Sequence, residues 1–162
     1  MENFIYQNHS YQLGVNFIPK NKAMVTIYSA DTGSVLVRPI VSLGISAGFP
    51  SPAMDFIDLS IDLNKYLIKH PSATYYGRVI GDSMKDAGID DGDLLIIDRS
   101  LEPTNGKIAV CYINGEFTLK KIKIDQDCCW LLPANEKYEP IKVTPDNDFI
   151  IWGIVIHVIK TV

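Results

Sequence analysis

The sequence has little of what stabilises secreted or metal-binding domains. Its 162 residues include three cysteines, Cys111, Cys128 and Cys129, an odd number without Cys-x-x-Cys spacing. This pattern supports neither a disulfide framework nor a zinc site, so we predict free, buried thiols, no metal and no cofactor. The three histidines are isolated from one another, and His157, within an apolar run, is expected to be structural.

Long apolar runs and strongly basic clusters are also lacking. The longest apolar stretch, 149–156, falls well short of the roughly 20 residues that span a bilayer, and polar residues interrupt the first twenty positions, where a signal peptide would lie. The net charge is −4, and the largest basic cluster is Lys120, Lys121 and Lys123, which does not indicate a phosphate-binding surface. We therefore expect a cytoplasmic protein without membrane contact or direct, sequence-specific DNA binding.

Short runs rich in β-branched residues, separated by turns with glycine, proline and asparagine, dominate the chain. They predict strands at 24–28, 34–41, 74–80, 93–98, 107–113, 116–124, 128–132 and 149–159. Asn114-Gly115 predicts a hairpin, and Asp62 and Pro71 bracket a short helix at about 62–69. We predict a mainly β fold, a small open barrel or pair of twisted sheets with one or two short helices.

Residues 42–52 read Ser-Leu-Gly-Ile-Ser-Ala-Gly-Phe-Pro-Ser-Pro. Small residues and prolines prevent this segment from sustaining a helix or a central strand. A chain of this length, 47% hydrophobic, can bury one core and carry an extra arm. The segment is therefore the expected boundary between an N-terminal arm, 1–46, and a domain, 47–162. On composition alone it is a plain linker.

A serine and a pair of lysines suggest chemistry. Ser83 lies in a Gly-Asp-Ser-Met turn, and its hydroxyl becomes an effective nucleophile only beside a base; a lysine serves when burial keeps it uncharged. Strand alternation does not choose between Lys120 and Lys121, because the apolar face of their strand switches near residue 120. Lys85, two residues after Ser83, is a rival base, expected to be solvated. No local periodicity brings Ser83 and Lys120 together, so the dyad is a hypothesis about tertiary structure.

Seven sequence blocks in a fixed order add to this pattern. They lie at 47–53, 61–64, 70–75, 81–84, 92–96, 115–118 with Lys120-Lys121, and 153–160. In these blocks the chain resembles the self-cleaving SOS-response proteins of the LexA/UmuD family, and most closely its UmuD branch. The resemblance covers about 110 residues, which makes it much more specific than any single motif.

The resemblance implies roles for particular residues. Ser83 would be the nucleophile, Lys120 the general base, and Ala47-Gly48 the scissile bond of the chain's own cleavage segment, 42–53. Both residues at that bond are small, as suits an extended segment pressed into a narrow cleft. The turn itself suggests that the backbone N–H groups of Asp82 and Ser83 form an oxyanion hole.

The same resemblance implies partners. Cleavage would be stimulated by a RecA filament on single-stranded DNA, and would remove the arm, 1–46. The cleaved form would act as a homodimeric accessory subunit of an error-prone translesion DNA polymerase. The apolar strand 149–159 could pair or pack across the two-fold axis. The arm is too short and too β-like for a helix-turn-helix domain, which disfavours a repressor role.

Two other classes of function fit parts of the pattern. One is a non-catalytic regulatory or interaction module that keeps the fold without cutting. The other is a signal-peptidase-like enzyme that acts on other chains, since those also use a Ser-Lys dyad; the lack of a membrane anchor in the sequence makes it remote. Resistance of the Ala47-Gly48 bond under alkaline conditions would favour the non-catalytic module.

Overall fold

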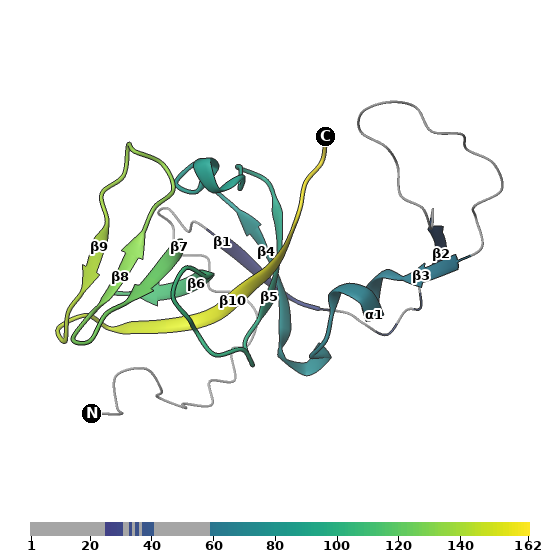
Figure 1. Ribbon diagram of the computed structural model, residues 1–162, viewed down its shortest axis with the longest axis horizontal. Helices are drawn as coiled ribbons and strands as arrows, with labels where there is room; N and C mark the ends of the chain where they lie inside the picture. Colours follow the sequence, from purple (N-terminus) through teal and green to yellow (C-terminus); the bar gives the residue numbers. More distant parts are fainter. Residues whose placement is uncertain (1–24, 31–32, 34, 36, 41–58) are drawn as a thin grey trace. The chain divides into compact units, whose positions relative to one another are not determined.

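The computed structural model describes residues 25–30, 33, 35, 37–40 and 59–162 (Figure 1). These residues fall in two compact units. The first contains β1, Val25–Ser29, together with residues 72–162, and the second contains the described residues between Ala30 and Pro71. The predicted cleavage segment, 42–53, lies outside the described residues.

An antiparallel sheet of eight strands forms the first unit, in the order β1-β4-β5-β10-β6-β7-β8-β9. After β1 the strands are β4 (Thr74–Val79), β5 (Leu94–Asp98), β6 (Ile108–Ile113), β7 (Glu116–Ile124), β8 (Cys129–Leu132), β9 (Ile141–Val143) and β10 (Phe149–Ile159). The sheet curls enough for β1 to contact β7, but it remains open. The predicted mainly β fold is therefore confirmed, as an open twisted sheet and not a closed barrel.

The long strand β10 runs between β5 and β6 (Figure 1). Its first half pairs with β6 and its second half with β5, and the register shifts once in each half, between Ile151 and Gly153 and between Val155 and His157. Such bulges bend a strand and increase its twist. Gly153 lies so close to β5 that an added Cβ would be 2.6 Å from Cγ2 of Ile97. Glycine is favoured there because any larger residue would press its Cβ against the Ile97 side chain.

Buried apolar side chains form two clusters in this unit. The first contains Val79, Met84, Ile89, Leu95, Ile97, Val110 and Leu119, and the second contains Ala109, Cys111, Ile122, Leu131 and Ile154. The strand β7 supplies Leu119 to the first cluster and Ile122 to the second. This division confirms the switch of the apolar face that the sequence predicts near residue 120.

The second unit contains a two-stranded antiparallel sheet, β2 (Val37–Ile40) with β3 (Leu59–Asp62). The helix α1, Leu63–Leu67, follows directly, and the Asp62 carboxylate caps it by accepting a hydrogen bond from Asn64 N at 3.1 Å. The predicted capping residue is therefore correct, although the helix is shorter than expected. Two short 3-10 turns complete the list of elements among the described residues. One, Pro71–Ala73, directly precedes β4, and the other, Lys85–Ala87, lies in the first unit.

The cysteines are free, as predicted, but only Cys111 is fully buried; Cys128 and Cys129 are half-buried. Within the described ranges, histidine, cysteine and acidic side chains form no group of three that could hold a metal ion. No helix in the described part of the chain is long and apolar enough to cross a membrane.

Candidate active site

Ser83 lies in the turn that follows β4, anchored by its neighbour Met84. The backbone enters this turn through Gly81, whose φ of 95° lies in the left-handed region that favours glycine. Met84 then inserts its side chain into the first core cluster, where it is 1% exposed. Its carbonyl accepts hydrogen bonds from Ala87 N and Ile89 N. The buried methionine holds Ser83 at the edge of the core, where the serine is 6% exposed.

Lys120 lies in the middle of β7 and reaches this turn. Its Nζ atom is 3.0 Å from Ser83 Oγ and donates a second hydrogen bond, also 3.0 Å long, to the carbonyl of Leu119. The side chain is 3% exposed. Lys121, the next residue along the strand, and Lys85, in the turn after Ser83, are both exposed. Of the three lysines that the sequence leaves open, the structure brings Lys120 to the serine.

Burial decides the charge of this lysine. Removal from water lowers the pKa of Lys120 from 10.5 to about 8, because the ammonium form loses its hydration. The thiol of Cys111 lies near enough to affect it, but burial raises the pKa of that thiol to about 12. Cys111 is therefore neutral over the range in which Lys120 titrates. A neutral lysine has a lone pair that the Ser83 hydroxyl can donate to across the same 3.0 Å contact.

The two amides that the sequence suggests for an oxyanion hole differ in the structure. The pKa of the Asp82 carboxylate lies below its ordinary value, mainly because Tyr138 donates a hydrogen bond to it and to a smaller extent because its own backbone N–H faces it. The Ser83 N–H donates to no acceptor among the described residues. The Ser83 amide is therefore the better placed of the two to bind a developing negative charge.

The loop between β8 and β9, 133–140, carries no sequence motif, yet it holds the Ser83 turn in place. Ala134, just after β8, donates from its N–H to the carbonyl of Ser83 at 2.9 Å and accepts from Asp86 N at 2.8 Å. In the sequence, Pro133, Ala134 and Asn135 carry only the composition that is typical of any loop. Their proximity to Ser83 depends on the pairing of β8 with β7, which no local pattern specifies.

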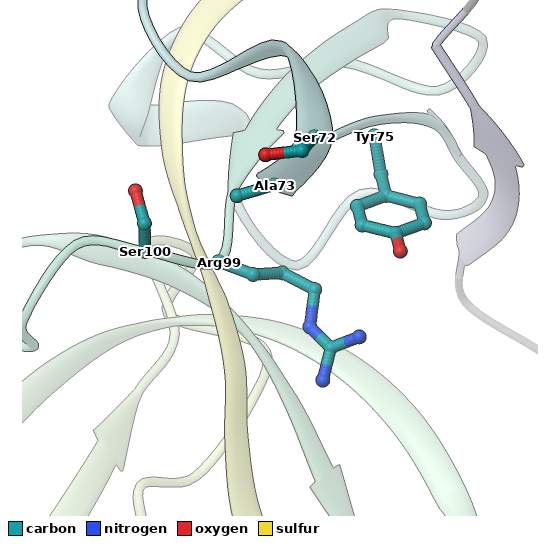
Figure 2. Close-up of a pocket in the computed structure, with 5 residues that line it drawn as sticks. All are labelled: Ser72, Ala73, Tyr75, Arg99 and Ser100. Atoms are coloured by element: carbon teal, nitrogen blue, oxygen red, sulfur yellow. The ribbon is translucent and has the colours of Figure 1, made fainter. Parts of the chain in front are cut away.

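An open pocket of about 270 Å³ occurs elsewhere in the unit (Figure 2). It is lined by Ser72, Ala73, Tyr75, Arg99 and Ser100. The guanidinium carbon of Arg99 lies 4.7 Å from the ring centre of Trp152, a cation–π contact that occupies its charged end. The pocket lies at the start of β4, whereas the Ser83 turn follows the end of that strand, so this pocket does not belong to the candidate active site.

Comparison with known proteins agrees with this geometry. Residues 39–156 match the family described as Peptidase S24-like. Protein MucA of Salmonella typhimurium is 46% identical over 114 residues, which cover 70% of this chain and 77% of MucA. Protein ImpA of Shigella flexneri is 40% identical over 76% of this chain and 83% of its own length.

A LexA repressor, from Alcanivorax borkumensis, is 41% identical over 116 residues. The match covers 72% of this chain but 56% of the repressor. The similarity to MucA and ImpA therefore extends over more of the relative's length than the similarity to LexA. The chain belongs to the Peptidase S24-like family of serine peptidases, in agreement with the resemblance to the self-cleaving LexA/UmuD proteins that its motifs predict.

Proposed function

We propose that the chain is a self-cleaving serine peptidase in which Ser83 is the nucleophile, Lys120 is the general base and Ala47-Gly48 is the bond cut. The observation that supports this best is the 3.0 Å contact between Lys120 Nζ and Ser83 Oγ. Both side chains are buried, and no carboxylate of the described residues bonds to the amine. An uncharged lysine beside a serine hydroxyl has the form of an activated nucleophile.

The reaction needs no group beyond these residues and water. Neutral Lys120 accepts the Ser83 proton while Oγ bonds to the carbonyl carbon of Ala47, which gives a tetrahedral oxyanion. Its collapse breaks the bond to the Gly48 nitrogen, which takes the proton from Lys120 and leaves as an amine. Water then attacks the ester, Lys120 takes its proton and returns it to Ser83 Oγ, and the acid of Ala47 is released.

Presentation of the chain's own segment gives a high effective concentration, so docking of residues 42–53 must be the controlled step. We propose that a RecA filament on single-stranded DNA favours the docked conformer by population shift. Removal of residues 1–47, which include the arm, 1–46, would leave a homodimeric accessory subunit for an error-prone translesion DNA polymerase in the cytoplasm. Membership of the family, and the extended similarity to MucA and ImpA, support these roles.

The direct test is to incubate the purified chain at about pH 10 and follow its intact mass over time. At that pH a lysine with a pKa of about 8 is almost entirely neutral. We expect fragments 1–47 and 48–162 from the unmodified chain and none from Ser83→Ala or Lys120→Ala. Lys121→Ala and Lys85→Ala are the matched controls, and both should be cut at the rate of the unmodified chain.

Other outcomes would contradict the proposal in different ways. A chain that stays intact, with and without an activated RecA filament, would favour the non-catalytic module. Loss of cleavage in Lys85→Ala, with cleavage retained in Lys120→Ala, would reassign the base. Fragments with a different boundary would leave the dyad in place but move the scissile bond.

A further inference from the structure

The loop after β8 makes a second set of contacts to the Ser83 turn, through side chains. Asn135 is 3% exposed, and its Nδ2 donates to the main-chain carbonyl of Asp82 at 2.9 Å and to the Asp82 carboxylate at 3.2 Å. Its Oδ1 accepts from Lys137 N at 3.1 Å. Both Asp82 atoms that Asn135 contacts are acceptors, so the Asn135 side-chain NH2 group must face Asp82 and its Oδ1 must face Lys137 N. Every polar atom of this buried side chain is therefore engaged.

Tyr138, at the end of the same loop, holds the other oxygen of that carboxylate. Its hydroxyl donates to Asp82 Oδ1 at 2.5 Å. The hydrogen bond from Tyr138 is the main reason that the pKa of Asp82 lies below its ordinary value, and the same bond raises the pKa of Tyr138. Asp82 is thus held at three oxygens, two on its side chain and one on its backbone, by residues from a distant part of the chain.

The backbone contact has a geometric consequence for Ser83. The carbonyl of Asp82 and the N–H of Ser83 belong to one peptide group, which is planar and trans, so the two point in opposite directions. A hydrogen bond that fixes the carbonyl therefore fixes the direction of the N–H. Ala134 holds the next carbonyl, that of Ser83 itself. The peptide groups on both sides of Ser83 are restrained from the same loop.

We propose that Asn135 is a positioning residue that aims the Ser83 N–H at the oxyanion formed during cleavage, and that Tyr138 supports it by holding Asp82. This inference rests on the proposed function. A preorganised donor stabilises a transition state because no reorientation is needed as charge develops, and loss of one donor typically costs about a hundredfold or more in rate. Asn135 acts through the peptide group and does not touch the reacting atoms.

The test uses Asn135→Ser in the full chain. Serine is neutral and can still accept from Lys137 N, but it is too short to reach Asp82. We expect the cleavage rate on the alkaline plateau, and the rate at which a fluorophosphonate labels Ser83, to fall together by about tenfold to a hundredfold. The pH midpoint of the rate should stay near 8, because Lys120 remains buried.

Asn147→Ser is the matched control. Asn147 also caps a turn, by accepting from Thr144 N at 2.8 Å, but it makes none of the contacts to the Ser83 turn. It should leave both rates unchanged. Tyr138→Phe provides a variant that keeps the fold in any case, since Tyr138 is 38% exposed; we expect the same two rates to fall by a few-fold.

Three results would overturn the inference. The first is an unmodified chain that neither cleaves nor labels, which removes the proposed function as well. The second is an active unmodified chain with Asn135→Ser and Tyr138→Phe both at its rate, which removes this inference alone. The third is a lowered rate in Asn135→Ser accompanied by a shift of the midpoint toward 10.5, which would show that the loop merely keeps water from Lys120.

Discussion

Two lysines of the first unit lie in opposite electrostatic environments. Lys120 is buried beside a hydroxyl and a carbonyl, and its pKa falls to about 8. Lys160 is partly exposed, with Nζ 2.5 Å from an oxygen of Asp90 and 2.8 Å from one of Asp93, and the hydrogen bond to Asp90 contributes most to raising its pKa. Burial lowers the pKa of Lys120, which suits it to accept a proton, whereas hydrogen bonds to two carboxylates raise the pKa of Lys160 and keep it charged.

The largest effects on cleavage and on stability should follow from Lys120→Met. Cleavage should be lost, by at least about a hundredfold, while the protein becomes more stable at pH 7. A lysine whose folded-state pKa is lowered from 10.5 to about 8 opposes folding by roughly 3 kcal/mol, since each pKa unit corresponds to about 1.4 kcal/mol. This destabilisation by Lys120 is complete below pH 8 and vanishes above pH 10.5. Urea unfolding at pH 7 and pH 10.5 measures it.

Lys121→Met is the control for that experiment, because this neighbouring side chain is exposed. It should change neither cleavage nor the pH dependence of unfolding. Equal stability of Lys120→Met and the unmodified chain at pH 7 would mean that Lys120 is better solvated than its 3% exposure indicates.

The next effect concerns the unmodified chain. If neutral Lys120 is the reactive form, the cleavage rate should rise about tenfold per pH unit below pH 8 and level off above it. Rates from intact mass between pH 6 and pH 11 give the midpoint. A rate that continues to rise beyond pH 10 would place the reactive lysine in water, like an ordinary surface residue.

A smaller effect is expected for Lys160→Met. Burial alone would raise the pKa of Asp93, but the hydrogen bond from Lys160, the backbone hydrogen bond from Asp90 and the charge of Lys160 together outweigh it and leave the pKa below its ordinary 3.8. Asp93 therefore contributes stability above that pH, which is lost as the pH falls. Without Lys160 the loss should begin at higher pH, so acid unfolding, followed by circular dichroism, should shift upward. Cleavage at pH 10 should stay within about twofold, because Lys160 bonds to Asp90 and Asp93 and makes no hydrogen bond to Ser83 or Lys120.

The smallest effect should come from Cys111→Ala. The thiol is neutral when Lys120 titrates, because burial raises its pKa to about 12. The midpoint of the cleavage rate should therefore stay where it is, while removal of a buried sulfur lowers the free energy of unfolding by roughly 1 kcal/mol. A midpoint that moves in this variant would show that the thiolate contributes charge to the site.

Much of this architecture follows from local signals in the sequence. Asp62 marks the start of α1, and the alternation in β7 changes face where the strand passes from one core cluster to the other. The sequence pattern does not predict the three-residue strand β9, because three residues are too few to show a period. Strand alternation also could not choose Lys120 over Lys121, since that choice depends on which face of β7 meets the Ser83 turn.

Asn135 is a second residue whose role cannot be predicted from the local sequence. Its contacts to Asp82 span 53 residues of sequence and arise from the position of the loop after β8. Nothing in a loop composition of alanine, asparagine and glutamate distinguishes a side chain that holds another turn from one that faces water. The residues of the dyad can be predicted from a family pattern, whereas the groups that restrain their geometry require the tertiary structure.

The pairing of β1 implies that release of the arm needs a second step after the proposed cleavage. This strand precedes residue 47, yet it pairs with β4 from Val25 opposite Val79 to Ser29 opposite Tyr75, and Ile27 packs against the first core cluster. Hydrolysis after Ala47 would therefore break a covalent tether without breaking this pairing. The arm would become a bound peptide, whose occupancy follows mass action instead of an intramolecular equilibrium. Hydrolysis of the bond and dissociation of the arm would then be separate steps. Lys120 would set the rate of hydrolysis, and dilution would favour dissociation.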